Sequence, residues 1–225
     1  THNGGPRFGR DWRAGPYTAG MRDRVLERLD EAGFDIQPGE ASKLAEYLLL
    51  LERWNRVHNL TGIARADEMV ERHLVESLAL RRFLRGERIA DVGSGAGLPG
   101  IPLAIAEPER TFTLIESRAK RVSFLNHVQG VLALTNVIVE HGRVEDLRST
   151  LPFDTVLARA VAPLPELVEL AAHLLGEESV LLVPTKADVD VAIGGVDDRF
   201  EIRRIEHDEN KLLKGALISI ERIAS

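Results

Sequence analysis

The change of hydrophobic periodicity at Gly86 constrains the fold more than any other feature of the sequence. After this residue, short apolar runs (RIADV, FTLIE, VIVE, DTVLA and SVLLV) alternate with amphipathic stretches. Strands that alternate with helices form βαβ units, and such units build a parallel sheet covered by helices. Two final runs, FEIRRIE and ALISIERI, are joined by a short polar link, which predicts an antiparallel hairpin. We therefore expect an α/β fold with a seven-stranded, mostly parallel sheet whose last strand is antiparallel.

The residues before Gly86 predict helices without strands. Apolar residues recur at helical spacing from Met21. A second helix is expected after Pro38, with one apolar stripe formed by Leu44, Tyr47, Leu48, Leu51 and Trp54. A third helix is expected to begin with Asp67 as its N-cap and to end at Gly86. Residues 1–20 hold five Gly and two Pro without apolar periodicity, which predicts a flexible arm. The predicted organisation is a basic arm (1–20), a helical cap (21–85) and an α/β core (86–225).

The composition excludes several classes of function. The chain has no Cys, which rules out disulfides, thiolate metal sites and every mechanism with a Cys nucleophile. Its formal net charge is −6, but residues 1–24 carry +3, so basic character is local. No apolar run is long enough to span a bilayer and no signal peptide is visible. We expect a soluble, cytoplasmic protein with no membrane contact and no metal site.

A glycine-rich loop, DVGSGAGLPG at residues 91–100, follows the first expected strand directly. Gly93, Gly95 and Gly97 permit positive φ, and their free N–H groups could attract a carboxylate or phosphate. Leu98 opens the next expected helix, with Pro99 in a first turn where no N–H is needed. This pattern predicts a nucleotide-type ligand site.

Three further candidates lie at the ends of expected strands. Glu116 ends the second strand, where an acidic residue can accept hydrogen bonds from both hydroxyls of a ribose. The Val144–Glu145 turn follows the third strand, where an adenine edge could meet a backbone N–H and a carboxylate. Arg159 follows the fourth strand and could hold a carboxylate in a bidentate contact, or a phosphate.

Two cofactor classes fit these residues. A dinucleotide of an NAD-dependent oxidoreductase would place a pyrophosphate on the loop, whereas S-adenosyl-L-methionine would place its amino-acid end there. The G-x-G-x-G spacing and the antiparallel hairpin favour S-adenosyl-L-methionine. Asp91 beside the loop favours it too, because a carboxylate repels pyrophosphate and attracts an ammonium group. The NAD-dependent oxidoreductase remains as the alternative.

Five segments of the chain resemble one known family. They are LERWNRVHNLTGI (51–63), ERHLVESL (71–78), DVGSGAGLPGIPLAI (91–105), ESRAKRVSFL (116–125) and ARAVAPL (158–164). Together they are similar to the small-subunit ribosomal RNA methyltransferase G family, also called glucose-inhibited division protein B. The resemblance runs from Met21 to the C-terminus. It departs from the family's RHxxDS at residues 72–77 and from its LKG at residues 185–187, where the chain has Thr-Lys-Ala.

The resemblance implies a class I S-adenosylmethionine-dependent methyltransferase, with a Rossmann-like core and an N-terminal helical cap. It implies methyl transfer to N7 of one guanine (family site: guanine 527) in 16S ribosomal RNA, within the 30S subunit or an assembly intermediate. The cofactor contacts that it implies are Gly93, Leu98, Val144, Glu145 and Arg159, with Glu116 at the ribose. Asp91, Gly95 and Gly97 complete the cofactor site that the loop itself predicts.

Guanine N7 carries an unprotonated lone pair, so no base is needed to deprotonate it before attack. We therefore expect a positioning mechanism, with Arg159, Lys186 and His73 as candidates; His73 is more readily interpreted as a hydrogen-bonded structural residue. RNA contacts are expected from the cations that flank the cofactor crevice, namely Arg118, Lys120, Arg121 and Lys186. Trp54, at helical spacing, is expected in the core. The acidic net charge also leaves open a non-catalytic RNA-binding or ribosome assembly factor on this fold.

Overall fold

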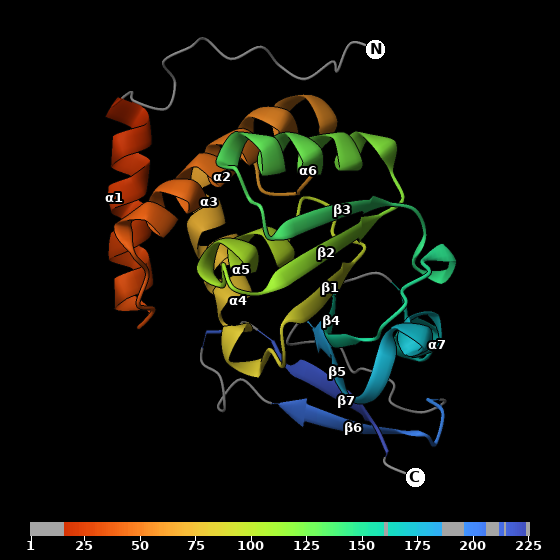
Figure 1. The fold of residues 1–225 in the computed structure, drawn as a ribbon. Coiled ribbons are helices and arrows are strands. Elements are labelled where there is room, and N and C mark those ends of the chain that lie inside the picture. The colour runs from red at the N-terminus through yellow and green to blue at the C-terminus, as the bar shows by residue number, and fades with distance from the viewer. Residues whose placement is uncertain (1–15, 160–161, 186–195, 206–211, 214, 224–225) are drawn as a thin grey trace.

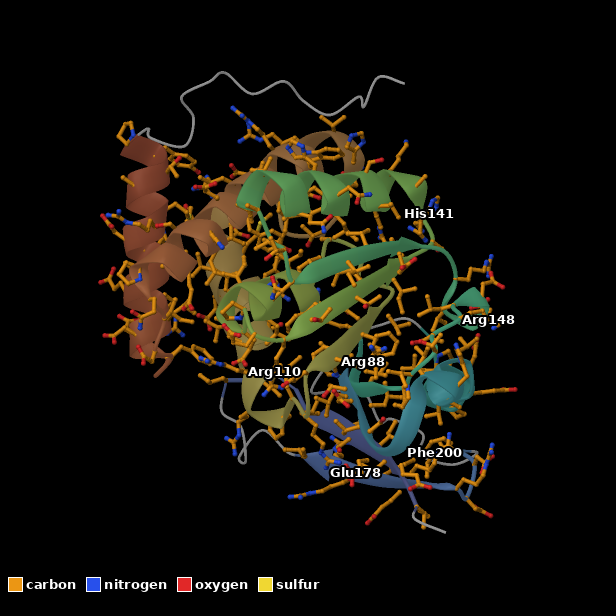
Figure 2. All side chains as sticks on the ribbon, viewed as in Figure 1. Arg88, Arg110, His141, Arg148, Glu178 and Phe200 are labelled. Atoms are coloured by element: carbon orange, nitrogen blue, oxygen red, sulfur yellow. The ribbon has the colours of Figure 1, made fainter. Side chains whose placement is uncertain are left out.

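A single seven-stranded sheet organises the molecule (Figure 1), and Figure 2 shows the side chains of the described residues in the same view. The computed structural model describes residues 16–159, 162–185, 196–205, 212–213 and 215–223. The strand order is β3-β2-β1-β4-β5-β7-β6. The strands are β1 (Arg88–Val92), β2 (Thr111–Glu116), β3 (Val137–His141), β4 (Phe153–Ala158), β5 (Leu175–Pro184), β6 (Phe200–Ile205) and β7 (Leu217–Arg222).

The predicted sheet is confirmed in its strand number and in its directions. Strands β3, β2, β1, β4 and β5 each pair in parallel with the next one in this order. Strand β7 pairs antiparallel with both β5 and β6. Strand order reverses between β1 and β4, because the chain proceeds from β1 to β2 and β3 on one side and returns to β4 on the other. In an open α/β sheet, such a point forms a crevice at the carboxyl ends of the strands.

Successive side chains of each strand point to opposite faces of the sheet. In β1, Ile89 belongs to the larger core cluster, which includes residues of the cap, α5 (Gly100–Ala106) and α6 (Ala119–Leu132). Ala90 and Val92 belong to a second cluster with α7 (Leu164–Ala171). Asp91 shares the parity of Ile89, so its side chain is directed at α5 and the cap.

The cap consists of helices packed onto one face of the sheet (Figure 1). Its first helix, α1 (Pro16–Glu31), begins five residues before the predicted start at Met21. Proline suits a first helical turn, and Thr18 is buried together with Met21, so the turn before Met21 is held by packing. Residues 16–20 are therefore helical, and the remainder of the predicted arm lies outside the described residues.

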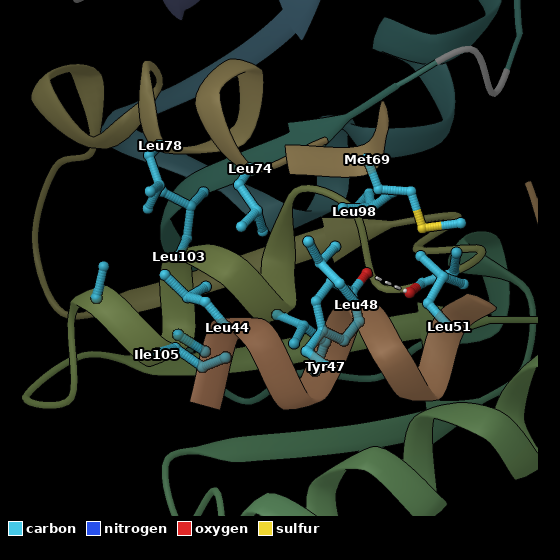
Figure 3. Close-up of a cluster of buried hydrophobic side chains, with 14 of the residues drawn as sticks. Leu44, Tyr47, Leu48, Leu51, Met69, Leu74, Leu78, Leu98, Leu103 and Ile105 are labelled. Atoms are coloured by element: carbon cyan, nitrogen blue, oxygen red, sulfur yellow. Dashed lines mark hydrogen bonds between the residues drawn. The ribbon is translucent and has the colours of Figure 1, made fainter. Parts of the chain in front are cut away.

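The second helix, α2 (Pro38–His58), is the centre of the cap. Leu44, Leu48 and Leu51 are fully buried on the predicted stripe. Leu50 is buried as well, and α1 packs against this helix. Figure 3 shows this stripe facing α5 and the loop before it. Trp54 lies in the core, as predicted, with its ring 5.5 Å from that of Phe124 in an edge-to-face contact.

The prediction of one regular helix from Asp67 to Gly86 is wrong. The segment forms α3 (Ala66–Met69), a π-helix (Val70–Val75), α4 (Glu76–Leu78) and a 3₁₀ turn (Arg81–Phe83). The N-cap is Arg65 rather than Asp67, because the Glu52 carboxylate of α2 accepts the N–H of Ala66 at 3.2 Å. The widened π turn carries His73, whose ring faces Thr61.

The segment from Trp54 to Thr61 contains the residues that end α2 and fix the loop after it. The Asn55 amide donates to the carbonyl of Ile63 at 2.9 Å and accepts the N–H of Thr61 at 2.8 Å. Asn59 ends the helix with φ 49°, a left-handed conformation that Asn tolerates better than most residues. These contacts fix the loop that brings Thr61 to His73. Within the described ranges, no helix combines the length and apolar character needed to cross a bilayer.

Replacing Asn55 by Ala should lower the free energy of unfolding by about 1–3 kcal/mol, because a loop N–H and a loop carbonyl lose their partner. Urea denaturation measures this change. Asn59→Gly is the matched control and should stay within about 0.5 kcal/mol of the wild type, because glycine adopts the same left-handed conformation. Equal midpoints for the two variants would contradict the role given to Asn55.

Candidate functional site

The candidate site lies where the strand order reverses. Val92 of β1 is paired with Ala158 of β4, so the glycine loop and Arg159 leave the sheet side by side. Glu116 ends the neighbouring strand β2. All four strands on which the sequence placed candidates, β1 to β4, are parallel neighbours, so their carboxyl ends lie at one edge of the sheet.

The glycine loop has the expected backbone but not the expected free donors. Gly93, Gly95 and Gly97 have φ values of 65°, 60° and 85°. The N–H groups of Gly93 and Ser94 donate to the carbonyl of Ile115, at 2.9 and 3.1 Å. Those of Gly97 and Leu98 donate to the carbonyl of Ser94, at 2.8 and 3.1 Å. The prediction that loop N–H groups bind an anion is wrong for these four donors, because each already donates to a backbone carbonyl of the protein.

The backbone N–H at the start of α5 also has a hydrogen-bond partner within the protein. This helix begins at Gly100, two residues after Leu98, and the Asp91 carboxylate Oδ2 accepts the Gly100 N–H at 3.0 Å. A Cβ at Gly100 would lie 2.6 Å from the same oxygen, so only glycine fits there. Asp91 therefore neutralises the helix start that would otherwise attract an anionic ligand.

Asp91 keeps one oxygen unused. Its side chain is 1% exposed, and Oδ1 has no hydrogen-bond partner in the described part of the chain. Burial raises the pKa of Asp91 from 3.8 to about 7, while the Gly100 N–H, Ser94 and Arg159 oppose the rise. A buried carboxylate oxygen without a partner is costly, and a ligand cation such as an ammonium group would relieve that cost.

Glu116 is held in place by the backbone around it. Its carboxylate accepts the N–H of Gly95 at 2.9 Å through Oε2 and the N–H of Arg118 at 2.8 Å through Oε1. Arg121 adds an ion pair at 3.5 Å. A carboxylate has about four acceptor positions, so capacity for ribose hydroxyls remains after these contacts. Arg121 is half-buried against Glu116, and its predicted RNA contact stays a prediction.

The cap contributes Tyr47, which the sequence did not single out. Its hydroxyl is buried and donates to the carbonyl of Ala96, inside the glycine loop, at 2.8 Å (Figure 3). Burial raises the pKa of Tyr47, so the phenol stays protonated as a donor. The sequence pattern placed Tyr47 in the apolar stripe of α2. Its hydroxyl group among aliphatic neighbours was the one indication of a polar contact.

His73 is hydrogen-bonded on both ring nitrogens, as expected of a structural residue. Nε2 lies 2.9 Å from the Thr61 hydroxyl and Nδ1 lies 3.1 Å from the carbonyl of Arg72. The carbonyl can only accept, so Nδ1 carries the proton and Nε2 accepts from Thr61. Burial, followed by the charge of Arg159, lowers the pKa of His73 to about 4. The ring is therefore neutral and only weakly basic.

Arg159 supplies the positive charge of the site. Its guanidinium influences the pKa of Tyr47, His73 and Asp91, so all three side chains lie within electrostatic reach of it. Across the described ranges, no hydrogen bond or ion pair holds its side chain. A half-buried guanidinium with open donors is well suited to a ligand carboxylate or phosphate.

The other predicted residues are placed as follows. Val144 is buried at the start of a 3₁₀ turn (Val144–Asp146), and the exposed Glu145 lies 3.5 Å from Arg143. Arg118 and Lys120 are exposed, while Lys186 lies outside the described residues. Their ligand roles stay predictions. Among the described residues, no cluster of His, Asp and Glu could hold a metal ion.

Comparison with known proteins decides the family. The sequence model for rRNA small subunit methyltransferase G matches residues 40–198. The chain belongs to this family. A ribosomal RNA small subunit methyltransferase G of Escherichia coli O17:K52:H18 is 42% identical over 70% of this chain and 76% of its own length. One from Salmonella arizonae is 37% identical over 83% of this chain and 90% of its own length.

The fold agrees with the family. The O-methyltransferase TomG from Streptomyces achromogenes, solved in complex with SAM, superposes with a TM-score of 0.53. It shares 19% identity, and the match covers 80% of this chain and 90% of that one. The predicted class I methyltransferase fold is confirmed, and membership of an rRNA methyltransferase family leaves the NAD-dependent oxidoreductase without support.

The raised pKa of Asp91 predicts a dependence of stability on pH. Between about pH 4 and pH 7 the folded chain keeps a proton that the unfolded chain loses, so the free energy of unfolding falls as pH rises. Asp91→Asn cannot ionise, so its stability relative to the wild type should increase across this window. Urea denaturation at pH 4.5 and pH 7.5 measures the difference.

The control for this experiment is Asp35→Asn, which removes an exposed carboxylate away from the site. Its stability relative to the wild type should change far less between the two pH values. If Asp91→Asn follows Asp35→Asn, Asp91 is not a destabilising buried charge.

Proposed function

We propose that this protein transfers a methyl group from S-adenosyl-L-methionine to N7 of a guanine in 16S ribosomal RNA, the family site being guanine 527. The substrate form is the 30S subunit or an assembly intermediate. The observation that carries the proposal is the buried Oδ1 of Asp91, which has no hydrogen-bond partner among the described residues and lies within electrostatic reach of the Arg159 guanidinium.

These two groups match the amino-acid end of the cofactor. Asp91 Oδ1 would accept the ammonium group and Arg159 would hold the carboxylate, so both charges of the methionine are neutralised. A pyrophosphate would instead face the Asp91 carboxylate at a loop whose donors at Gly93, Ser94, Gly97 and Leu98 are already used. Glu116 would accept the ribose hydroxyls, and the Val144–Glu145 turn would meet the adenine.

The protonation states of the site favour a nucleophile that needs no deprotonation. His73 has a pKa of about 4 and its Nε2 lone pair accepts the Thr61 hydroxyl. Tyr47 is protonated and donates to Ala96, and Asp91 is bound to Gly100. Neither His73 nor Tyr47 is therefore an activated general base, and the open Oδ1 of Asp91, whose pKa of about 7 would suit a base, is assigned to the ammonium group of the cofactor. Guanine N7 has an available lone pair, whereas an exocyclic amine or a hydroxyl would have to lose a proton.

The residues of the chain then act by binding and orientation. Bound S-adenosyl-L-methionine supplies an electrophilic methyl carbon on a sulfonium. Attack by N7 forms the N–C bond and breaks the S–C bond, and positive charge passes from sulfur to the purine. Holding both reactants in line can supply about 7–11 kcal/mol of the barrier reduction. Asp91, Arg159 and Glu116 would orient the cofactor for this attack.

The substrate assay uses labelled S-adenosyl-L-methionine and 30S subunits from a strain that lacks the endogenous enzyme. We expect label in 16S rRNA, recovered as 7-methylguanosine after nuclease digestion and mass spectrometry. Label in another base, or at another atom of guanine, would contradict the proposal. A single-turnover reaction with saturating cofactor and no transfer would identify a non-catalytic RNA-binding factor instead.

Tyr47→Phe tests the connection between the cap and the cofactor loop. Removing the hydroxyl leaves the Ala96 carbonyl buried without its donor, so the loop should lose its fixed position. We expect affinity for S-adenosyl-L-methionine to fall by about tenfold, which is about 1.4 kcal/mol. Isothermal titration calorimetry measures it.

Tyr17→Phe is the matched control, because it removes a hydroxyl from an exposed tyrosine of α1. It should bind the cofactor like the wild type. Equal affinity for Tyr47→Phe and Tyr17→Phe would show that the cap does not hold the loop in its binding conformation.

A further inference from the structure

Two segments of the chain contain no acidic residue. They are residues 53–66 and residues 117–139, and each carries a net charge of +3 from Lys and Arg. Asp and Glu make up 35 of the 225 residues and the whole chain carries −6. Residues 77–86 also carry +3 without an acidic residue, so positive charge is confined to a few short stretches of an otherwise acidic protein.

The two segments pack against each other in the fold. The first contains the last turns of α2 and the second contains α6. The ring of Trp54 lies 5.5 Å from that of Phe124 and 5.6 Å from that of His127. Figure 1 shows α6 as an outer helix beside the cap, over β2 and β3. We call the exposed part of these segments the α2–α6 surface.

The cations of the α2–α6 surface face solvent. Arg53, Arg56, Arg118 and Lys120 are exposed. Arg56 approaches Glu52 only at 3.4 Å and its side chain is 69% exposed. Arg118 and Lys120 form no ion pair with any carboxylate of the described residues. Arg118 and Lys120 therefore present positive charge that no carboxylate of the described residues neutralises.

The charge at the start of α6 is opposite to what helix stability favours. The positive end of a helix dipole favours Asp or Glu in the first turn, yet the first turn of α6 has no acidic residue and carries Lys120 and Arg121. Arg121 is explained by its ion pair with Glu116. Lys120 has no such ion pair among the described residues, so its charge is available to a ligand.

The α2–α6 surface is continuous with the candidate site. Arg118, the N-cap of α6, donates its N–H to Glu116. At the other segment, Thr61 contacts His73, which lies near Arg159. A strand whose base reached the site would therefore have its neighbouring nucleotides beside these cations.

We propose that the α2–α6 surface binds the phosphate backbone of the RNA strand that presents the target base. This inference rests on the proposed function, because it names the surface that holds the same substrate. Phosphates fit the surface by charge, and Arg and Lys contacts to phosphate position nucleic acid without reading its sequence. The cations act as a substrate-binding surface, with no part in the transfer step.

The experiment measures binding of Lys120→Glu and Arg56→Gln to 30S subunits that lack the modification, at several salt concentrations. We expect the apparent dissociation constant to rise by about tenfold for Lys120→Glu. The slope of log affinity against log salt should fall by about 1 for each cation removed. Thermal stability of Lys120→Glu should equal or exceed that of the wild type, because the new carboxylate suits the helix start.

Lys43→Glu is the matched control, since it makes the same charge change at an exposed position in the first half of α2. It lies 13 residues before Arg56, which is roughly 20 Å along the helix. It should bind 30S subunits and methylate them like the wild type. Affinity for S-adenosyl-L-methionine is measured for every variant, to exclude damage to the cofactor site.

The outcomes separate this inference from the proposed function. If wild-type protein methylates guanine N7 and Lys120→Glu binds 30S subunits as tightly as Lys43→Glu does, the inference is wrong and the proposed function stands. If wild-type protein methylates another atom, the proposed function fails, while the salt slopes still report whether this surface contacts phosphate. Equal losses for both variants would show a general effect of net charge and would overturn the inference.

Discussion

The arrangement of the site depends on a single buried carboxylate. Asp91 lies on β1, at the reversal of strand order, and its Oδ2 holds the first turn of α5 through Gly100. The other oxygen has no hydrogen-bond partner in the described part of the chain, at a position that is 1% exposed. Burying such a group is unfavourable for folding, so its retention is best explained by a ligand that carries positive charge there.

The remaining elements keep that carboxylate and its surroundings in place. The cap reaches the loop through Tyr47 and reaches Arg159 through the π turn that carries His73. Glu116 holds the loop from the other side by accepting the N–H of Gly95. Cap, loop and second strand thus converge on one crevice. A methyl transfer that needs no proton removal can be accelerated by such rigidity alone.

Sequence patterns predicted the sheet, its closing hairpin and the strand ends that carry Asp91, Glu116 and Arg159. They did so because periodicity and loop position are local properties. Contacts across the chain were not predictable in this way. The Tyr47 contact with Ala96, the Glu52 carboxylate that begins α3 and the use of the loop N–H groups all depend on tertiary packing. The roles of Val144, Glu145 and Lys186 stay predictions.

The central claim is that Asp91 Oδ1 receives the ammonium group of S-adenosyl-L-methionine. A crystal structure of the protein with S-adenosylhomocysteine, which keeps the same amino-acid end, tests it directly. We expect the amino nitrogen within hydrogen-bonding distance of Asp91 Oδ1, about 2.7–3.2 Å, and the carboxylate on Arg159. A ligand bound with its amino nitrogen elsewhere, and Oδ1 still without a partner, would contradict the account.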